Sequence, residues 1–158
     1  MVAHVYAETR GLEVVIIRPF NTVGPRQTGR YGMVLPNFVA QALRGDPITV
    51  YGDGSQTRSF CYVDDEVRGF LALLDSDLVG PTNIGNPNEY TILELAQAVL
   101  EVTGSSSEIV FEPLPVDDPM QRKPDITRAS EHLGWKPEVE LRAGIEATAG
   151  HFRRVLGL

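Results

Sequence analysis

Apolar residues occur in two patterns along this chain of 158 residues, as short continuous runs and at helical spacing. Near the start, "LEVVII" at residues 12–17 is almost continuously apolar and β-branched, which is typical of a strand covered on both faces of a parallel sheet. The segments "ITVYG", "TNIG" and "EIVFEPLP" predict three further short strands. The pattern therefore predicts a sheet that is built at least partly from buried strands.

Helical spacing of apolar residues predicts six helices, and glycines mark the ends of several of them. They lie around residues 1–10, 34–43, 65–74, 91–103, 127–133 and 141–156. Strands and helices alternate, which favours the α/β or α+β class. The length predicts one domain over residues 1–158.

The helix expected around residues 65–74 carries four apolar residues at helical spacing. These residues are Val67, Phe70, Leu71 and Leu74. Asp64 or Asp65 is expected to cap the first turn of this helix. In the next helix, "TILE" at residues 91–94 predicts a capping box.

Composition and charge argue against several classes of binding partner and site. The net charge of −7 and the pI near 4.9 argue against a nucleic-acid or anionic-membrane binder. No apolar run approaches about 18 residues and no signal peptide is evident, so we expect a cytoplasmic protein. Cys61 is the single cysteine and predicts a small core residue rather than a reactive thiol. The three histidines lack metal-ligand spacing, so we expect no metal site.

The residues needed for dinucleotide chemistry do not occur in their usual patterns. A Gly-x-Gly-x-x-Gly fingerprint would place pyrophosphate against a helix N-terminus, but Gly52 and Gly54 are followed by Thr57 at the third position. A Tyr-x-x-x-Lys pair is also absent, and the first lysine is Lys123. The sequence therefore predicts no catalytic residue in this chain.

Several polar residues are instead placed to hold a ligand. Asn21 directly follows the apolar strand, where open α/β sheets bind ligands, but it could equally cap its own backbone in a turn. Arg58 and Arg122 lie in stiff loops, where a planar guanidinium could bind an anion; each could also be a solvated surface residue. Tyr51 either contacts a ligand or packs in the core.

Four motifs occur in order along the chain: "RPFNTVGPR", "VLPNFVAQALRGDPITVYGDGSQTRSFCYVDDEV", "TNIGNPNEYTILELAQ" and "DDPMQRKPDITRASEHLGWKP". Together they resemble the C-terminal half of extended short-chain dehydrogenases acting on nucleotide sugars, the NAD-dependent epimerase/dehydratase family. UDP-glucuronate decarboxylases resemble the chain most, followed by UDP-glucose 4-epimerases and dTDP-glucose 4,6-dehydratases. The implied fold is the substrate-binding part of an extended Rossmann-type fold, lacking the N-terminal dinucleotide-binding half. Residues 1–20 would then be a remnant helix and strand of the Rossmann part.

The resemblance also implies a substrate-binding set. Asn21 matches a family asparagine near the diphosphate, Arg58 matches an arginine on phosphate, and Arg122 matches one near the ribose and diphosphate. Thr22 matches a position near the nicotinamide end of NAD, and Val23 replaces a frequent tyrosine, which leaves the sugar open. The positions that match segments beside the base, ribose and nucleotide are Leu35, Pro36, Phe38, Val50 and Tyr51.

Three hypotheses follow from the residues and the resemblance. In the first, the chain is the UDP- or dTDP-sugar-binding portion of an NAD-dependent epimerase, dehydratase or decarboxylase. It would be inactive alone, and NAD would bind the full-length family members rather than this chain. In the second, it is a free-standing nucleotide-sugar-binding module. In the third, it is a truncated fragment that forms homo-oligomers through its first 20 residues, because the apolar strand lacks neighbours.

Overall fold

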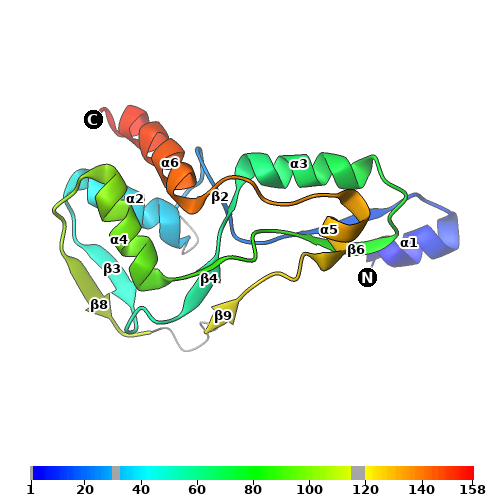
Figure 1. Cartoon of the computed structure of the whole chain (residues 1–158), viewed down its shortest axis with the longest axis horizontal. Helices are drawn as coiled ribbons and strands as arrows, with labels where there is room; N and C mark the ends of the chain where they lie inside the picture. Colours follow the sequence, from blue (N-terminus) through cyan, green and yellow to red (C-terminus); the bar gives the residue numbers. More distant parts are fainter. Residues whose placement is uncertain (1, 30–32, 115–119) are drawn as a thin grey trace.

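The computed structural model describes residues 2–29, 33–114 and 120–158. It is a mixed α/β structure in which short parallel strand pairs lie between helices (Figure 1). The helices are α1 (Val2–Arg10), α2 (Val34–Arg44), α3 (Val63–Leu74), α4 (Ile92–Thr103), α5 (Thr127–Leu133) and α6 (Leu141–Leu156). The strands are β1 (Val15–Pro19), β2 (Thr22–Val23), β3 (Ile48–Tyr51), β4 (Thr57–Ser59), β5 (Cys61–Tyr62), β6 (Gly80–Ile84), β7 (Glu89–Thr91), β8 (Ile109–Glu112) and β9 (Gln121–Arg122).

The predicted helix ends agree with the structure. Gly45, Gly104 and Gly134 adopt left-handed backbone conformations directly after α2, α4 and α5. The capping box of α4 is also confirmed. The Glu94 amide donates to Thr91 Oγ1 at 3.1 Å, and the Thr91 amide donates to the Glu94 carboxylate at 2.7 Å.

The expected cap of α3 is wrong. Tyr62 is its N-cap residue and no side chain caps the first turn, so Asp64 and Asp65 are not caps. The four apolar residues at helical spacing are exposed, whereas the buried face consists of Asp65, Glu66, Gly69 and Leu73. Gly69 explains the rotation of the helix: a Cβ there would lie 2.6 Å from Ile84 Cγ2, so the missing side chain lets α3 lie against β6.

The first apolar strand pairs in parallel with β6, from Val15 opposite Gly80 to Pro19 opposite Ile84. It begins three residues later than the apolar run, and the preceding Leu12 is exposed. Helix α3 packs on both strands and α5 packs on β6. Within the described ranges, β1 has no second strand beside it.

The remaining strands form three small groups. Strand β3 pairs in parallel with β8, and β2 pairs in parallel with β5. Strand β4 lies at the centre of a three-stranded sheet, antiparallel to β7 and parallel to β9. The strands β2, β4, β5, β7 and β9 were not predicted, because two or three residues carry too little periodicity to indicate a strand.

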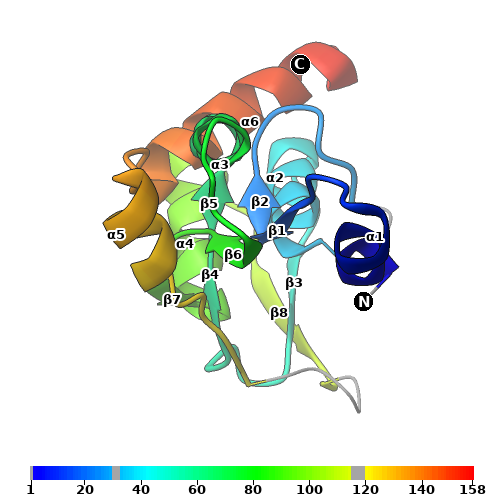
Figure 2. The same cartoon turned by 90° about the vertical axis from the view of Figure 1, so that its right-hand side faces the viewer.

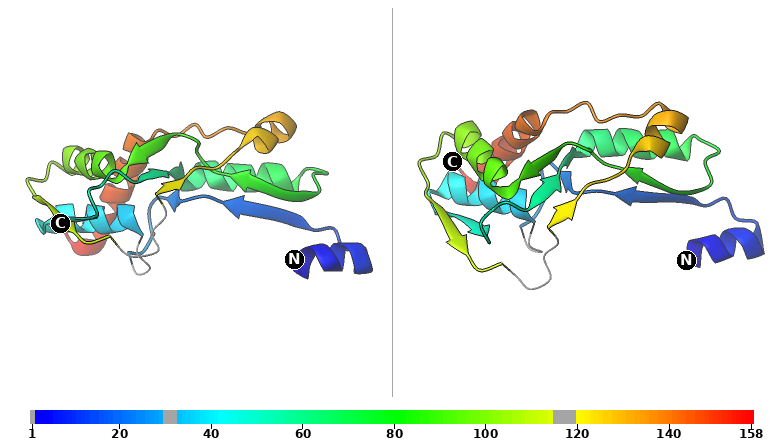
Figure 3. Two further views of the ribbon diagram at one scale, coloured as in Figure 1. Left: turned by 90° about the horizontal axis from the view of Figure 1, so that it is seen from below. Right: turned by 60° about the horizontal axis from the view of Figure 1, so that its bottom comes forward.

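Two apolar clusters hold the chain together. The larger is formed by α2, α4 and α6 over β3, with Val39, Leu95 and Ile145 fully buried. The smaller joins Cys61, Ile84, Ala129 and Trp135 between α3, α5 and β6. Both views of Figure 3 show an elongated molecule. We call α2, α4, α6, β3 and β8 the lobe, and α1, β1, β6, α3 and α5 the arm.

Candidate functional site

The two candidate arginines lie side by side. In the sheet β7–β4–β9, Arg58 is the register partner of Arg122 on one side and of Tyr90 on the other. Because register partners project to the same face of a sheet, the three side chains form a row across it. Arg58 is 8% exposed and its Nη1 donates to the Thr57 carbonyl at 2.8 Å, whereas Arg122 is exposed. Tyr90 was not predicted as a member of this row, since only the strand pairing reveals it.

A carboxylate on the opposite face ties the three strands together. Glu89 on β7 accepts from Thr57 Oγ1 at 2.9 Å and from Gln121 Nε2 at 2.6 Å. Lys123 also pairs with it at 3.2 Å. The hydrogen bonds from Gln121 and then Thr57 hold the pKa of Glu89 below its usual value. The ionised Glu89 thus fixes β9, and with it Arg122, against β4.

Asn21 lies where β1 ends, as expected for a ligand-binding position in an open α/β sheet. Its φ of 43° is left-handed, which asparagine tolerates and which agrees with the turn interpretation. Its carbonyl accepts from the Cys61 amide at 3.2 Å, which fastens this loop to the segment after Arg58. Its Nδ2 atom is buried and has no hydrogen-bond partner among the residues that the structure describes. Thr22 follows on β2 as the register partner of Cys61.

Gly85 brings the Asn21 loop and the Arg122 loop together at the end of β6. A Cβ at this position would lie 2.8 Å from Phe20 Cβ and 3.0 Å from Pro124 Cγ. Only glycine therefore allows both loops to approach it. Asn83 Nδ2 also donates to the Asp125 carbonyl at 2.9 Å. The loops that carry Asn21 and Arg122 thus converge beyond the carboxyl ends of β1 and β6.

The glycine loop after β3 is a closed turn. Gly52 and Gly54 have φ values of 70° and 77°, and Asp53 Oδ1 accepts from the Ser55 amide at 2.9 Å. Gln56 Nε2 donates to the Tyr51 carbonyl at 2.7 Å, which closes the loop. The interpretation that these glycines turn the chain, rather than cradle a phosphate, agrees with this geometry.

The candidates beside the nucleotide differ in accessibility. Tyr51 is half-exposed, so its ring can meet a ligand. Val50 is fully buried in the larger cluster, and so could contribute only through its backbone. The side chains of the other three candidates, Leu35, Pro36 and Phe38, are buried on the inner face of α2. Their contact with a nucleotide stays a prediction.

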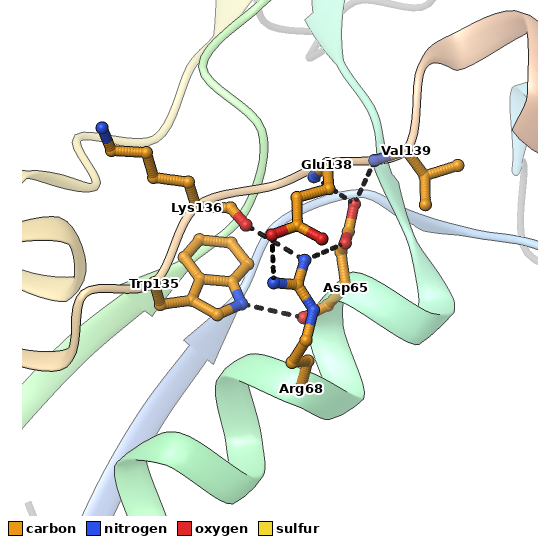
Figure 4. A network of polar contacts seen from close by, with 6 residues as sticks. All are labelled: Asp65, Arg68, Trp135, Lys136, Glu138 and Val139. Carbon is orange, nitrogen blue, oxygen red and sulfur yellow. Dashed lines mark hydrogen bonds and ion pairs between the residues drawn. The ribbon is translucent and has the colours of Figure 1, made fainter.

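A network around Asp65 joins the N-terminal end of α3 to the segment before α6, and the sequence did not reveal it (Figure 4). Asp65 Oδ2 accepts from the amides of Glu138 and Val139, both at 2.9 Å. Arg68 pairs with Asp65 Oδ1 and, at 3.0 Å, with Glu138. Trp135 Nε1 donates to the Asp65 carbonyl at 3.0 Å. The carboxylate therefore fastens the chain that leads from the arm into α6.

Two buried ionisable groups lie next to the Asn21 loop. Burial, with added repulsion from Glu66 and Asp65, raises the pKa of Cys61, which fits the prediction of an inert core residue. Burial also raises the pKa of Glu66 to about 7. The Phe20 amide, the Thr22 hydroxyl and the Cys61 thiol moderate this rise. Neither Glu66 oxygen, however, has a partner of hydrogen-bond geometry among the described residues.

A cavity of about 800 Å³ lies beside the Arg122 loop but is separate from the arginine row. It is formed by the loop at residues 86–88, the segment after β9 and α5. Its charged residues are two lysines and two acids, Lys123, Lys136, Asp125 and Glu131. Because these charges balance, the cavity favours no anion.

The parallel strand pair with loops converging beyond its carboxyl ends is typical of an α/β protein of the Rossmann-like class. The model of the NAD dependent epimerase/dehydratase family matches residues 1–85, more than half of the chain. The chain belongs to this family. This confirms the predicted family and the predicted fold class.

Similar proteins include UDP-glucuronic acid decarboxylase 1 of Arabidopsis thaliana, 53% identical over 148 residues. That match covers 94% of this chain and 34% of that protein. The structure of a UDP-glucose 4-epimerase from Thermotoga maritima with UDP-glucose has a TM-score of 0.92 and 35% identity. A UDP-glucuronic acid 4-epimerase from Bacillus cereus, in complex with UDP-glucuronic acid and NAD, has a TM-score of 0.90 and 33% identity.

The chain spans only part of these proteins. The match with the Thermotoga maritima protein covers 99% of this chain and 51% of that chain. The match with the Bacillus cereus protein covers 98% of this chain and 49% of that chain. Among the described residues, no helix is both long and apolar enough to cross a membrane.

Proposed function

We propose that this chain is the nucleotide-sugar-binding portion of an NAD-dependent epimerase, decarboxylase or dehydratase, and that it has no activity alone. The observation that carries the proposal is the pairing of Arg58 with Arg122 across β4 and β9. Two guanidinium groups on one face suit a ligand with two adjacent negative charges, such as the diphosphate of a UDP- or dTDP-sugar. Solved relatives that carry UDP-glucose or UDP-glucuronic acid support this ligand class.

The surrounding residues suit the same ligand. The buried Nδ2 atom of Asn21 can donate a hydrogen bond to a phosphate or sugar oxygen. The exposed ring of Tyr51 can pack against the base or ribose. Because the arginine row creates a local positive site, the overall charge of −7 is no obstacle to binding a dianion.

We propose that the described residues do not form an NAD site by themselves. Pyrophosphate recognition in this class needs a glycine turn that leads from a strand into a helix. Here the turn at Gly52 and Gly54 closes on itself and leads into the strand β4. We therefore place NAD in the full-length protein, where Thr22 would lie near its nicotinamide end.

Calorimetry and a turnover assay test the two parts of this proposal separately. UDP and UDP-glucuronic acid should bind, whereas uridine, which lacks the diphosphate, should bind at least tenfold more weakly. With NAD added, neither UDP-glucose nor UDP-glucuronic acid should be converted. Equal affinity for uridine and UDP would refute the diphosphate site, and clear turnover would refute inactivity. Binding without turnover by the complete natural protein would favour a free-standing binding module.

We also propose that the chain alone forms homo-oligomers through residues 1–20. The supporting observation is that, among the described residues, one edge of β1 has no partner strand, which leaves backbone amides and carbonyls able to pair with another strand. Light scattering should show a concentration-dependent rise in mass. A clean monomer at high concentration would contradict this.

A further inference from the structure

A buried carboxyl group, that of Glu66, lies next to the loop that presents Asn21. Glu66 is 2% exposed and belongs to the inner face of α3. Helix α3 packs on β1, β2, β5 and β6, and Figure 2 shows it end-on with these four strands beneath it. Because Asn21 lies in the link between β1 and β2, this packing brings Glu66 to the base of the candidate ligand loop.

Glu66 adjoins the residues on both sides of Asn21. The Phe20 amide, the Thr22 hydroxyl and the Cys61 thiol are close enough to its carboxyl group to lower its pKa. The Cys61 amide in turn donates to the Asn21 carbonyl at 3.2 Å. A change in the charge of Glu66 therefore acts on the residues that fix the conformation of Asn21.

The ionised form of Glu66 lacks good partners in this arrangement. Neither of its oxygens has a hydrogen-bond partner among the residues that the structure describes. The Phe20 amide already donates to the Ile84 carbonyl at 3.0 Å. The next cation along the helix, Arg68, pairs with Asp65 instead. Because a buried carboxylate without partners is costly, Glu66 ionises only if water enters or the adjacent loop moves toward it.

The other titratable groups around α3 do not offset a charge on Glu66. Asp65 repels it, and Cys61 and Tyr62 on β5 are neutral at pH 7 because their pKa values are raised. The charged or titratable side chains on β1, on α5 and in the segment before α6 are exposed, so water screens them. They are Arg18, Arg128, Glu131, His132, Lys136 and Glu138.

We propose that Glu66 is a positioning residue for the Asn21 loop, and that a nucleotide sugar binds preferentially when Glu66 is protonated. This inference rests on the proposed nucleotide-sugar site. The protonated group leaves the Phe20 amide and the Thr22 hydroxyl in place, so the buried Nδ2 atom of Asn21 stays available to the ligand. The ionised group draws these donors toward itself and adds a negative charge beside a ligand that carries two. Binding therefore takes up a proton near neutral pH.

Calorimetry with UDP-glucose tests this inference, because a diphosphate that is esterified at both ends keeps its charge between pH 6 and pH 8. Glu66, with a pKa of about 7, is mostly protonated at the lower pH and mostly ionised at the higher. The affinity of the unaltered chain should therefore fall about tenfold from pH 6 to pH 8. At pH 7, two buffers of different ionisation enthalpy should reveal the uptake of about half a proton per ligand.

Two variants assign the pH dependence to this side chain. Glu66→Gln keeps the size of the side chain but cannot ionise, so its affinity should be independent of pH and about tenfold higher than that of the unaltered chain at pH 8. Asp64→Asn removes an exposed acid of the same helix and should retain the fall in affinity. A fall that persists in Glu66→Gln, or an equal loss of affinity in this variant at every pH, would overturn the inference.

Two further outcomes separate this inference from the proposed function. Absence of binding at every pH would refute the nucleotide-sugar site and this inference with it. Binding by the unaltered chain with a flat pH profile would overturn only the role of Glu66. In the ligand-free chain, the amide resonances of Phe20 and Thr22 should shift with a midpoint near pH 7, and this shift should be absent in Glu66→Gln. Amide resonances that do not respond to pH in the unaltered chain would also overturn the inference.

Discussion

Arg58 and Arg122 are register partners in a parallel pair of strands, although α3, α4 and several strands separate them in the sequence. Like charges at opposite positions of a sheet repel each other. Glu89 of β7 lies on the other face of the sheet and holds β4 and β9 in this register, because it accepts hydrogen bonds from Thr57 and Gln121. An anion between the two guanidinium groups would offset the repulsion, so we expect ligand binding to stabilise the fold as well.

Alanine substitution of either arginine should weaken UDP binding. Removing a partner of a desolvated ligand charge costs about 2–5 kcal/mol, so Arg58→Ala, at the buried position, should reduce affinity at least thirtyfold. Arg122 is exposed, so Arg122→Ala should cost less, about 1 kcal/mol. Calorimetry at fixed ionic strength measures both.

Two further variants sharpen this test. Arg58→Lys keeps the charge but loses the planar fork, and should restore only part of the affinity. Arg44→Ala removes an exposed arginine at the end of α2 and should leave affinity unchanged. If Arg58→Ala binds UDP as tightly as the unaltered chain, the site assignment is wrong.

The neighbouring acids Asp64 and Asp65 should differ sharply in their importance for stability. Asp65→Ala leaves two backbone amides without their acceptor and removes one of the partners of Arg68, and should lower the free energy of unfolding by about 3 kcal/mol. Asp64→Ala changes an exposed side chain and should alter it by less than about 0.5 kcal/mol. Urea denaturation distinguishes them. Similar losses in both variants would support helix capping, as the sequence first suggested.

The contrast between these two acids shows how far sequence patterns reach. Helix positions and ends were predictable because glycine and the capping box act within one turn of their own helix. The role of Asp65 was not, because its partners are backbone amides some 70 residues later, which carry no residue-type signal. The exposure of the apolar residues on α3 was not predictable, since periodicity does not say what covers a face.

In the candidate site, too, the sequence predicts some positions, whereas others are revealed only by the strand pairing. The sequence alone places Asn21 at the end of a strand, because the apolar run before it predicts that strand. The side-by-side position of Arg58 and Arg122 depends on β9, which has two residues and no periodicity. Tyr90 joins the row for the same reason and could be found only from the pairing.

Gly69 should be intolerant of a methyl group. A Cβ at this position would lie 2.6 Å from Ile84 Cγ2 and 3.0 Å from the Trp135 indole. Because both neighbours are buried, Gly69→Ala should lower the free energy of unfolding by about 1–3 kcal/mol. Gly150→Ala in α6 is the matched control, since nothing lies within 4 Å of its Cβ, and it should stabilise the helix by about 0.5–1 kcal/mol. Stabilisation by both changes would contradict the close contact of α3 with β6.

Glu66 should make the stability of the fold depend on pH. Burial raises its pKa in the folded chain to about 7 from an ordinary value of 4.5, so the folded state holds a proton that the unfolded state releases between these values. The stabilisation is therefore complete below about pH 4.5 and is lost as the pH rises through about 7. The shift corresponds to roughly 3 kcal/mol at most.

Comparison with Glu66→Gln isolates this contribution. Asp53, Glu89 and Asp125 have lowered pKa values and act in the opposite sense, losing stability as the pH falls, but they are common to both proteins. The free energy of unfolding of the Gln variant, minus that of the unaltered chain, should rise between pH 5 and pH 8. A flat difference for Glu66→Gln would mean that Glu66 is ionised throughout this range, which would contradict the raised pKa.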